Sequence, residues 1–158
     1  MPIYMQYGTI KGDVTADGHK DWIEVNSFQW GVGRGITSPT GGSSDRESSA
    51  PSVSEIVVTK SEDKATVDLL NDALQGEGVD VTIDFCKTDK GKLETYLEYV
   101  LNDTLISGFS TSSGGDRPSE SLSLNFTKIM CKDTSMGAKN ETGDPSSVTY
   151  DLAQAKVV

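Results

Sequence analysis

The sequence predicts a mainly β fold: a compact β-barrel of two packed antiparallel sheets, with one flanking α-helix from about Asp63 to Gln75. Several short segments alternate apolar and polar residues with a period of two, one segment has helical spacing, and polar loops separate them. A chain of 158 residues is close to the usual size of one domain. We therefore expect residues 1–158 to form a single domain.

The first two strands are expected to form a hairpin. Residues 3–14 are rich in apolar and aromatic side chains, and a long aromatic segment follows at 22–32. Asp17 and Gly18 lie between them and form a dipeptide typical of tight turns.

The second of these segments changes its apolar phase along its length. Ile23 and Val25 occupy odd positions, whereas Phe28, Trp30 and Val32 occupy even ones. Either a bulge near residues 26–27, or burial of opposite faces at the two ends, would produce this change.

Two long polar intervals are predicted to be loops. Residues 37–52 are rich in Ser, Gly and Pro, and they exceed the length of an ordinary hairpin connection. Residues 132–147 have a similar composition. We expect an extended loop at about 37–52 and a second polar loop at about 132–147.

One segment has the spacing of a helix, and it follows a short strand predicted at 53–60. Asp63 is a suitable N-cap residue, and Gly76 a suitable end. The apolar residues between them are expected to lie on one stripe that faces the core. They are Val67, Leu69, Leu70, Ala73 and Leu74.

The remaining segments are predicted to be strands. Residues 79–86 alternate apolar side chains with Asp and Thr, and residues 121–127 and 148–152 alternate in the same way. Residues 93–101 fit either a helix or a strand, and their tyrosines and valine favour a strand.

The charge of the chain excludes some partners. Its formal net charge is -10, so it repels phosphate backbones and anionic membrane surfaces. We expect neither nucleic acid nor membrane as a partner. Copies of such a chain repel each other within a Debye length of about 10 Å at 0.1 M salt, so self-association needs apolar or complementary contacts.

The N-terminal residues have no basic region followed by an apolar stretch, so we expect no Sec-type signal peptide. Cys86 and Cys131 are too far apart for a CxxC motif and too few for a disulfide framework. Both are expected to be reduced and structural.

The groups needed for catalysis are not evident in the sequence. The single histidine, His19, falls next to the predicted turn, where a side chain is ordinarily solvated, and no motif supplies companions for a triad or a metal site. Asp80 and Asp84 share the polar face of a predicted strand, which favours solvated charge over acid–base catalysis. We expect no enzymatic activity, no catalytic residue, no cofactor and no metal.

Two further patterns have structural explanations. The glycines from Gly31 to Gly35 do not have the GxGxxG spacing and no helix follows, so a twisted strand is the better interpretation than a phosphate site. Trp22, Phe28 and Trp30 favour core or subunit interface, although a carbohydrate-stacking platform remains an alternative. That alternative describes a monomeric β-sandwich module that binds carbohydrate.

Several blocks, taken in order, resemble the haemolysin-coregulated protein (Hcp) family of bacterial type VI secretion systems. No single block is specific, but the ordered series covers nearly the whole chain. The blocks lie at residues 18–32, 53–60, 63–70, 122–129 and 150–152.

The resemblance implies a compact β-barrel with a flanking helix, six copies of which form a ring. Rings would stack into a hollow tube that is propelled into a target cell. It further implies export without a signal peptide, a cytoplasmic stage before export, and small effectors chaperoned in the ring lumen. The implied partners are the protein itself and the tube, tip and sheath components of the secretion system.

The resemblance also implies roles for particular residues. The extended loop at 37–52 matches, by position and length, a loop that contacts the next ring in this family, and opposite charges there can fix register. Its candidate stacking residues are Thr37, Ser38, Thr40, Ser43, Asp45, Arg46 and Glu47. Gln29 is expected on the face opposite Phe28 and Trp30, and by resemblance it is a candidate lumen residue.

Overall fold

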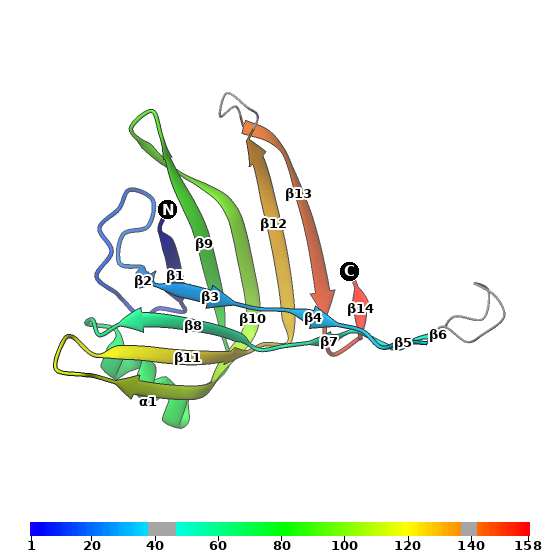
Figure 1. Cartoon of the computed structure of the whole chain (residues 1–158), viewed down its shortest axis with the longest axis horizontal. Coiled ribbons are helices and arrows are strands. Elements are labelled where there is room, and N and C mark those ends of the chain that lie inside the picture. Colours follow the sequence, from blue (N-terminus) through cyan, green and yellow to red (C-terminus); the bar gives the residue numbers. More distant parts are fainter. Residues whose placement is uncertain (38–46, 137–141) are drawn as a thin grey trace.

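Antiparallel strands make up most of the structure, and they form an upright sheet standing on a second, crossing sheet (Figure 1). The computed structural model describes residues 1–37, 47–136 and 142–158. None of the described helices is both long and apolar enough to span a bilayer. The elements are β1 (Ile3–Tyr7), β2 (Ile23–Val25), β3 (Ser27–Gln29), β4 (Val32–Gly33), β5 (Ile36–Thr37), β6 (Glu47–Ser48), β7 (Ser52–Val53), β8 (Ile56–Ser61), α1 (Thr66–Gln75), β9 (Val79–Asp89), β10 (Lys92–Ser112), β11 (Ser119–Asn125), β12 (Lys128–Met136), β13 (Thr142–Asp151) and β14 (Lys156–Val157).

We call the two sheets the wall and the floor. The wall has the strand order β2-β1-β9-β10-β12-β13-β14, and the floor has the order β10-β11-β8-β3. All of these pairings are antiparallel. The mainly β prediction of two antiparallel sheets with one helix is therefore confirmed.

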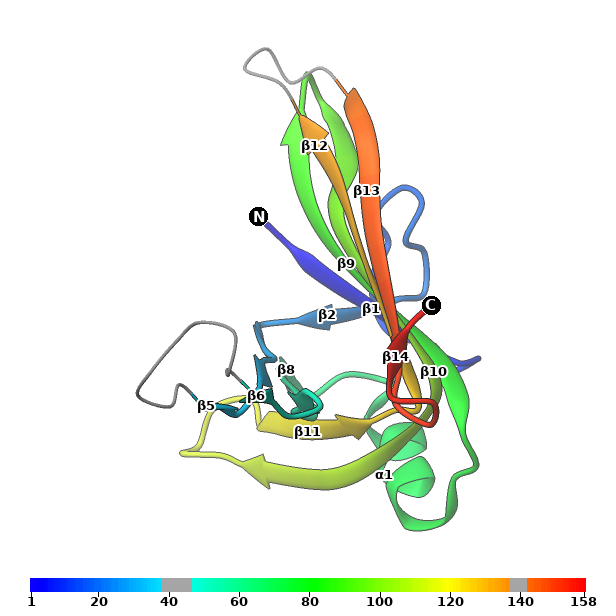
Figure 2. The same cartoon turned by 90° about the vertical axis from the view of Figure 1, so that its right-hand side faces the viewer.

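The longest strand, β10, belongs to both sheets. Its first part pairs with β9 as far as Thr104, and from Leu105 it pairs with β11. Both ladders shift register near this point, and Asp103 has a φ of 52°. A bulge of this kind bends a strand, so β10 turns from the wall into the floor (Figure 2).

A second corner lies at Asn26, between β2 and β3. β2 pairs with β1 in the wall, whereas β3 pairs with β8 in the floor, and the Asn26 N–H donates to the Thr59 carbonyl of β8 at 2.7 Å. Ile23 and Val25 are buried from one sheet and Phe28 packs against the core from the other. The change of apolar phase therefore marks the point where the chain changes sheets.

These corners complete a circuit of strands around the core. The strands follow the hydrogen-bonded order β2-β1-β9-β10-β11-β8-β3. The last strand, β3, is joined to the first, β2, by the backbone at Asn26, so the circuit is closed by a covalent connection and not by strand pairing. This arrangement is compatible with the predicted barrel of two packed sheets. The pair β12 and β13 extends the wall beyond it (Figure 1).

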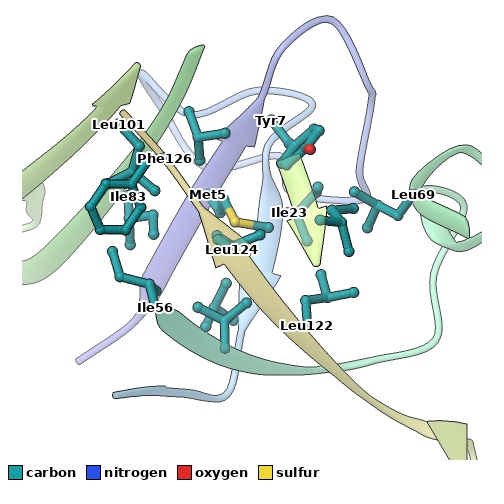
Figure 3. Close-up of a cluster of buried hydrophobic side chains, with 14 of the residues drawn as sticks. Met5, Tyr7, Ile23, Ile56, Leu69, Ile83, Leu101, Leu122, Leu124 and Phe126 are labelled. Carbon is teal, nitrogen blue, oxygen red and sulfur yellow. The ribbon is translucent and has the colours of Figure 1, made fainter. Parts of the chain in front are cut away.

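The core fills the angle between wall and floor (Figure 3). Met5, Ile23 and Ile83 point inward from the wall, Leu122 and Leu124 point inward from the floor, and all are fully buried. Burial of each such side chain contributes about 1.5–3 kcal/mol. Side chains on alternate positions of these strands therefore hold the two sheets together.

The start of α1 differs from the prediction. The helix begins at Thr66 with Ala65 as its N-cap, and Ala65 makes no side-chain capping bond. Asp63 instead accepts the Ala65 N–H on its carboxylate and the Thr66 N–H on its carbonyl, which closes a turn before the helix. The predicted end is confirmed, since Gly76 is extended and its N–H donates to the Asp72 carbonyl.

The buried face of α1 is narrower than predicted. Leu69 is buried and Ala73 packs against the core, but Val67, Leu70 and Leu74 are exposed. At about 100° per residue these five side chains span an arc of about 160°, which is wider than the core can cover. The helix therefore leaves an apolar strip facing outward.

The prediction of a second polar loop at 132–147 is also wrong for the described residues. Residues 132–136 belong to β12 and residues 142–147 to β13, and they pair directly with each other. Backbone hydrogen bonds do not depend on side-chain polarity, so a strand made of Ser, Thr and Asp is hard to recognise. Pro145 is tolerated because β14 pairs only with Tyr150 and Asp151, so β13 is an edge at Pro145 and its N–H is not needed.

Candidate assembly surfaces

A narrow two-stranded ribbon, which we call the arm, extends from the floor. β4 pairs with β7 and β5 pairs with β6, and the Ser54 and Ser49 N–H groups donate to the carbonyls of Gly31 and Gly35. The glycine-rich segment is thus a strand ribbon that leads into no helix, which agrees with the structural interpretation of its sequence.

Two of the seven candidate stacking residues belong to the described part of this arm. Thr37 and Glu47 are paired at its last described rung. Ser38, Thr40, Ser43, Asp45 and Arg46 fall within 38–46 and lie outside the described residues. The interval predicted as an extended loop thus begins and ends in strand pairs.

The outer face of the floor carries mainly small polar side chains. Ser27, Thr59, Ser121 and Ser110 form one row across its four strands. The neighbouring row, which begins with Gln29, also contains no charged residue; it continues with Val57, Ser123 and Gly108. These two rows carry no charge in a chain with a net charge of -10, although Glu55 lies beside them.

Gln29 lies on this face, opposite Phe28 and Trp30, as its position in the alternation predicts. It is exposed, and it lines a hollow of about 480 Å³ together with Trp30 and Glu55. The Trp30 indole N–H donates to the Ser54 carbonyl at 3.1 Å, which fixes one side of the hollow. The arrangement offers an amide, hydroxyls and backbone groups for hydrogen bonding to a polypeptide.

The three candidate aromatic residues do not form one platform. Phe28 stacks on Tyr99 with ring centroids 5.0 Å apart, and Trp30 meets the same tyrosine edge-on at 5.7 Å. Trp22 lies on the opposite face of the wall, against His19 at 4.5 Å. Rings packed against other rings in two separate clusters suit a core better than a flat sugar-binding surface.

His19 is not solvated, contrary to the sequence prediction. The segment between β1 and β2 folds over the wall, and His19 is buried there with its Nε2 2.8 Å from Asp84 Oδ2. Asp84 is buried as well. The prediction of a solvated charge, made from its place on the polar face of the strand, is therefore also wrong. The sequence gives no signal for this contact, because it depends on how the connecting segment folds back.

The geometry of this cluster does not form a catalytic triad. Cys86 Sγ lies 3.8 Å from the same His19 Nε2 that bonds Asp84, whereas Nδ1 faces the Asp17 carbonyl. A triad needs nucleophile and acid on different ring nitrogens. Burial also raises the pKa of the Cys86 thiol, which disfavours the reactive thiolate.

On the neighbouring strand β10, Glu98 lies directly opposite Asp84, the partner of this histidine. Burial, together with the hydrogen bond to Asp84 and the charge of Asp84, raises the pKa of Glu98 to about 7. Within the described residues, no group of three or more His, Cys, Asp or Glu side chains could hold a metal ion.

Comparison with known proteins identifies the chain. The profile described as "Type VI secretion system effector, Hcp" matches residues 4–132. The solved "Structure of a type six secretion system protein" has 25% identity and a TM-score of 0.90, covering 99% of both chains. Hcp1 from Salmonella typhimurium has 20% identity and a TM-score of 0.77, covering 99% of this chain and 98% of its own.

A third structure, the secreted protein Hcp3 from Pseudomonas aeruginosa, has 25% identity and a TM-score of 0.62, and it covers 92% of this chain and 97% of its own. No curated protein sequence matches. Because the family profile covers most of the chain, the protein belongs to the Hcp family of type VI secretion system effectors.

Proposed function

We propose that this protein is a tube subunit of a type VI secretion system, with a structural and not an enzymatic role. Six copies close into a ring, rings stack into a hollow tube, and the tube protein is itself secreted. The observation that carries the proposal is the agreement with a type six secretion system protein over 99% of both chains.

The arm is the proposed contact between stacked rings. Its backbone ladders hold an exposed ribbon away from the barrel, and the last described rung pairs two of the candidate residues, Thr37 and Glu47. A narrow ribbon can enter a neighbouring ring without requiring large areas of a strongly acidic surface to meet.

The outer face of the floor is the proposed lumen wall, with Gln29 facing bound cargo. Its two central rows carry hydroxyl and amide groups and no charge, and Glu55 lies beside them. Hydroxyl and amide groups can bond a polypeptide of either charge, so such a wall can chaperone different small effectors. The other proposed partners are the tip and sheath components of the same apparatus. Export proceeds without a signal peptide, from a cytoplasmic pool.

Sedimentation tests the ring directly. We expect a species with the mass of six chains across micromolar concentrations, since each subunit contact should bury more than roughly 1,000 Å² in total. Only monomer over this range would contradict the proposal.

The lumen assignment has its own test, in a Cys131→Ser background that leaves only the buried Cys86. A Gln29→Cys residue should react with a small maleimide in the assembled ring but resist a maleimide attached to a large polymer. Equal labelling by both reagents would place residue 29 on the outside.

A further inference from the structure

The outward side of α1 carries an apolar strip that nothing in the described part of the chain covers. Val67, Leu70 and Leu74 are 74%, 41% and 77% exposed. Their spacing places them within about 60° of one another around the helix axis. We call these three side chains the outer stripe, and a contiguous strip of this kind marks an interaction site more often than scattered apolar residues do.

The arm also carries two exposed apolar side chains. Val32 is 55% exposed and Ile36 is 47% exposed, and the exposed Arg34 lies between them. The ion pairs of the described residues do not include Arg34. The arm therefore presents a cation flanked by two apolar side chains.

The charges beside the outer stripe complement this arrangement. Asp68 lies in the first turn of α1, next to Val67 in the chain, and Glu77 follows the end of the helix. The nearby Lys64 is already close to Asp21, with 3.9 Å between Nζ and Oδ1. The helix thus presents an apolar strip to solvent, with Asp68 about 100° around the axis from Val67. The arm presents an apolar pair beside Arg34, which forms no ion pair with another described residue.

The two surfaces cannot meet within one molecule. Figure 1 places α1 and the arm toward opposite ends of the longest axis, and Figure 2 shows them on separate sides of the floor. A contact between two different surfaces of the same chain joins copies head to tail and can repeat without limit. Such a contact suits an open stack of rings.

We propose that the outer stripe of α1 is the docking site for the arm of a second copy in the adjacent ring. Val32 and Ile36 pack on the stripe, and Arg34 pairs with Asp68 of the neighbouring copy. This inference rests on the proposed stacking of rings and names the surface that receives the arm.

Cross-linking tests the contact in the full-length chain. A chain with Ile36→Cys, Leu70→Cys and Cys131→Ser should give, on mild oxidation, a ladder of linked chains whose length follows the number of stacked rings. The matched controls carry only one of the two new cysteines and should give no ladder. Hexamers that stack but form no ladder in the double-cysteine chain would overturn the inference.

A charge exchange tests the same contact without oxidation. Arg34→Glu should lower light scattering to the level of single rings, because it places two acids together. Adding Asp68→Arg should restore it. Arg117→Glu is a matched control, since this arginine is exposed and already faces Asp13 and Glu62; it should leave scattering unchanged.

Sedimentation of each variant separates the two proposals. Absence of hexamers in the unmodified protein contradicts the ring itself. Intact hexamers whose stacking Arg34→Glu does not change contradict only the inference. Loss of the hexamer in the Arg34→Glu variant also overturns it, because the arm would then act within the ring and not between rings.

Discussion

At the scale of single residues, the core contains a buried charge, on Lys60, whose pairing is essential to stability. This side chain is wholly buried, its Nζ lies 2.6 Å from Glu120 Oε1 across the ladder between β8 and β11, and Asp63 Oδ1 lies 2.9 Å away. Buried charges are tolerated when paired, and removal of one partner leaves the other charge exposed to an apolar medium.

Glu120→Gln should therefore lower the free energy of unfolding by about 2–3 kcal/mol. The loss is limited because Lys60 remains paired with Asp63. Chemical denaturation measures the change. Asp13→Asn is the control, because its carboxylate lies 3.8 Å from Arg117 at the surface and should matter by less than about 1 kcal/mol. Equal effects of the two substitutions would show that burial does not set the cost.

Glu98 makes stability depend on pH in a defined direction. Its pKa in the folded protein, about 7, is raised above that of the unfolded chain, so the folded state favours its protonated form. The stability it contributes is complete below the unfolded pKa and is lost as pH rises through about 7. Glu98→Gln should be more stable than the natural protein at pH 8 and nearly equal to it at pH 4, measured by denaturation midpoints. An equal gain at both pH values would contradict this account.

The sequence could not reveal these residues because their roles depend on contacts distant along the chain. Lys60 and Glu120 are separated by 60 positions, and His19 and Asp84 by 65. Each lies on a pattern that is normally solvated. The positions of Gln29 and Phe28 were predictable, since alternation along one strand decides them.

At the scale of elements, alternation predicted the strands that bury one face and failed where side chains are uniformly polar. β9 and β11 follow the predicted pattern, whereas β12 and β13 continue well into the interval expected to be a loop. The helix was placed correctly at its end, but its buried face was overestimated because periodicity does not say how much of a stripe the core covers.

The two sides of α1 should respond differently to the same truncation. Leu69→Ala should cost about 2–5 kcal/mol, because this side chain is fully buried between the sheets and leaves a cavity. Leu74→Ala should change the monomer by less than about 0.5 kcal/mol, since it removes an exposed group. Denaturation of the two variants under conditions that dissociate rings gives the comparison, and similar losses would contradict the assigned faces.

At the scale of the whole molecule, assembly must overcome repulsion between acidic chains. Each copy carries a net charge of -10, and added salt screens exposed charges within about 10 Å at 0.1 M. Raising salt from low to moderate concentration should therefore increase light scattering by stacked rings. A decrease would show that attractive charge pairs, and not repulsion, limit the assembly.

Negative-stain electron microscopy of the purified protein tests the central claim most directly, because it shows ring closure and stacking in one measurement. The account predicts particles with six-fold symmetry and an open centre in end views, and short stacks in side views. Fields of single compact particles at micromolar concentration, with no ring at any salt concentration, would contradict it.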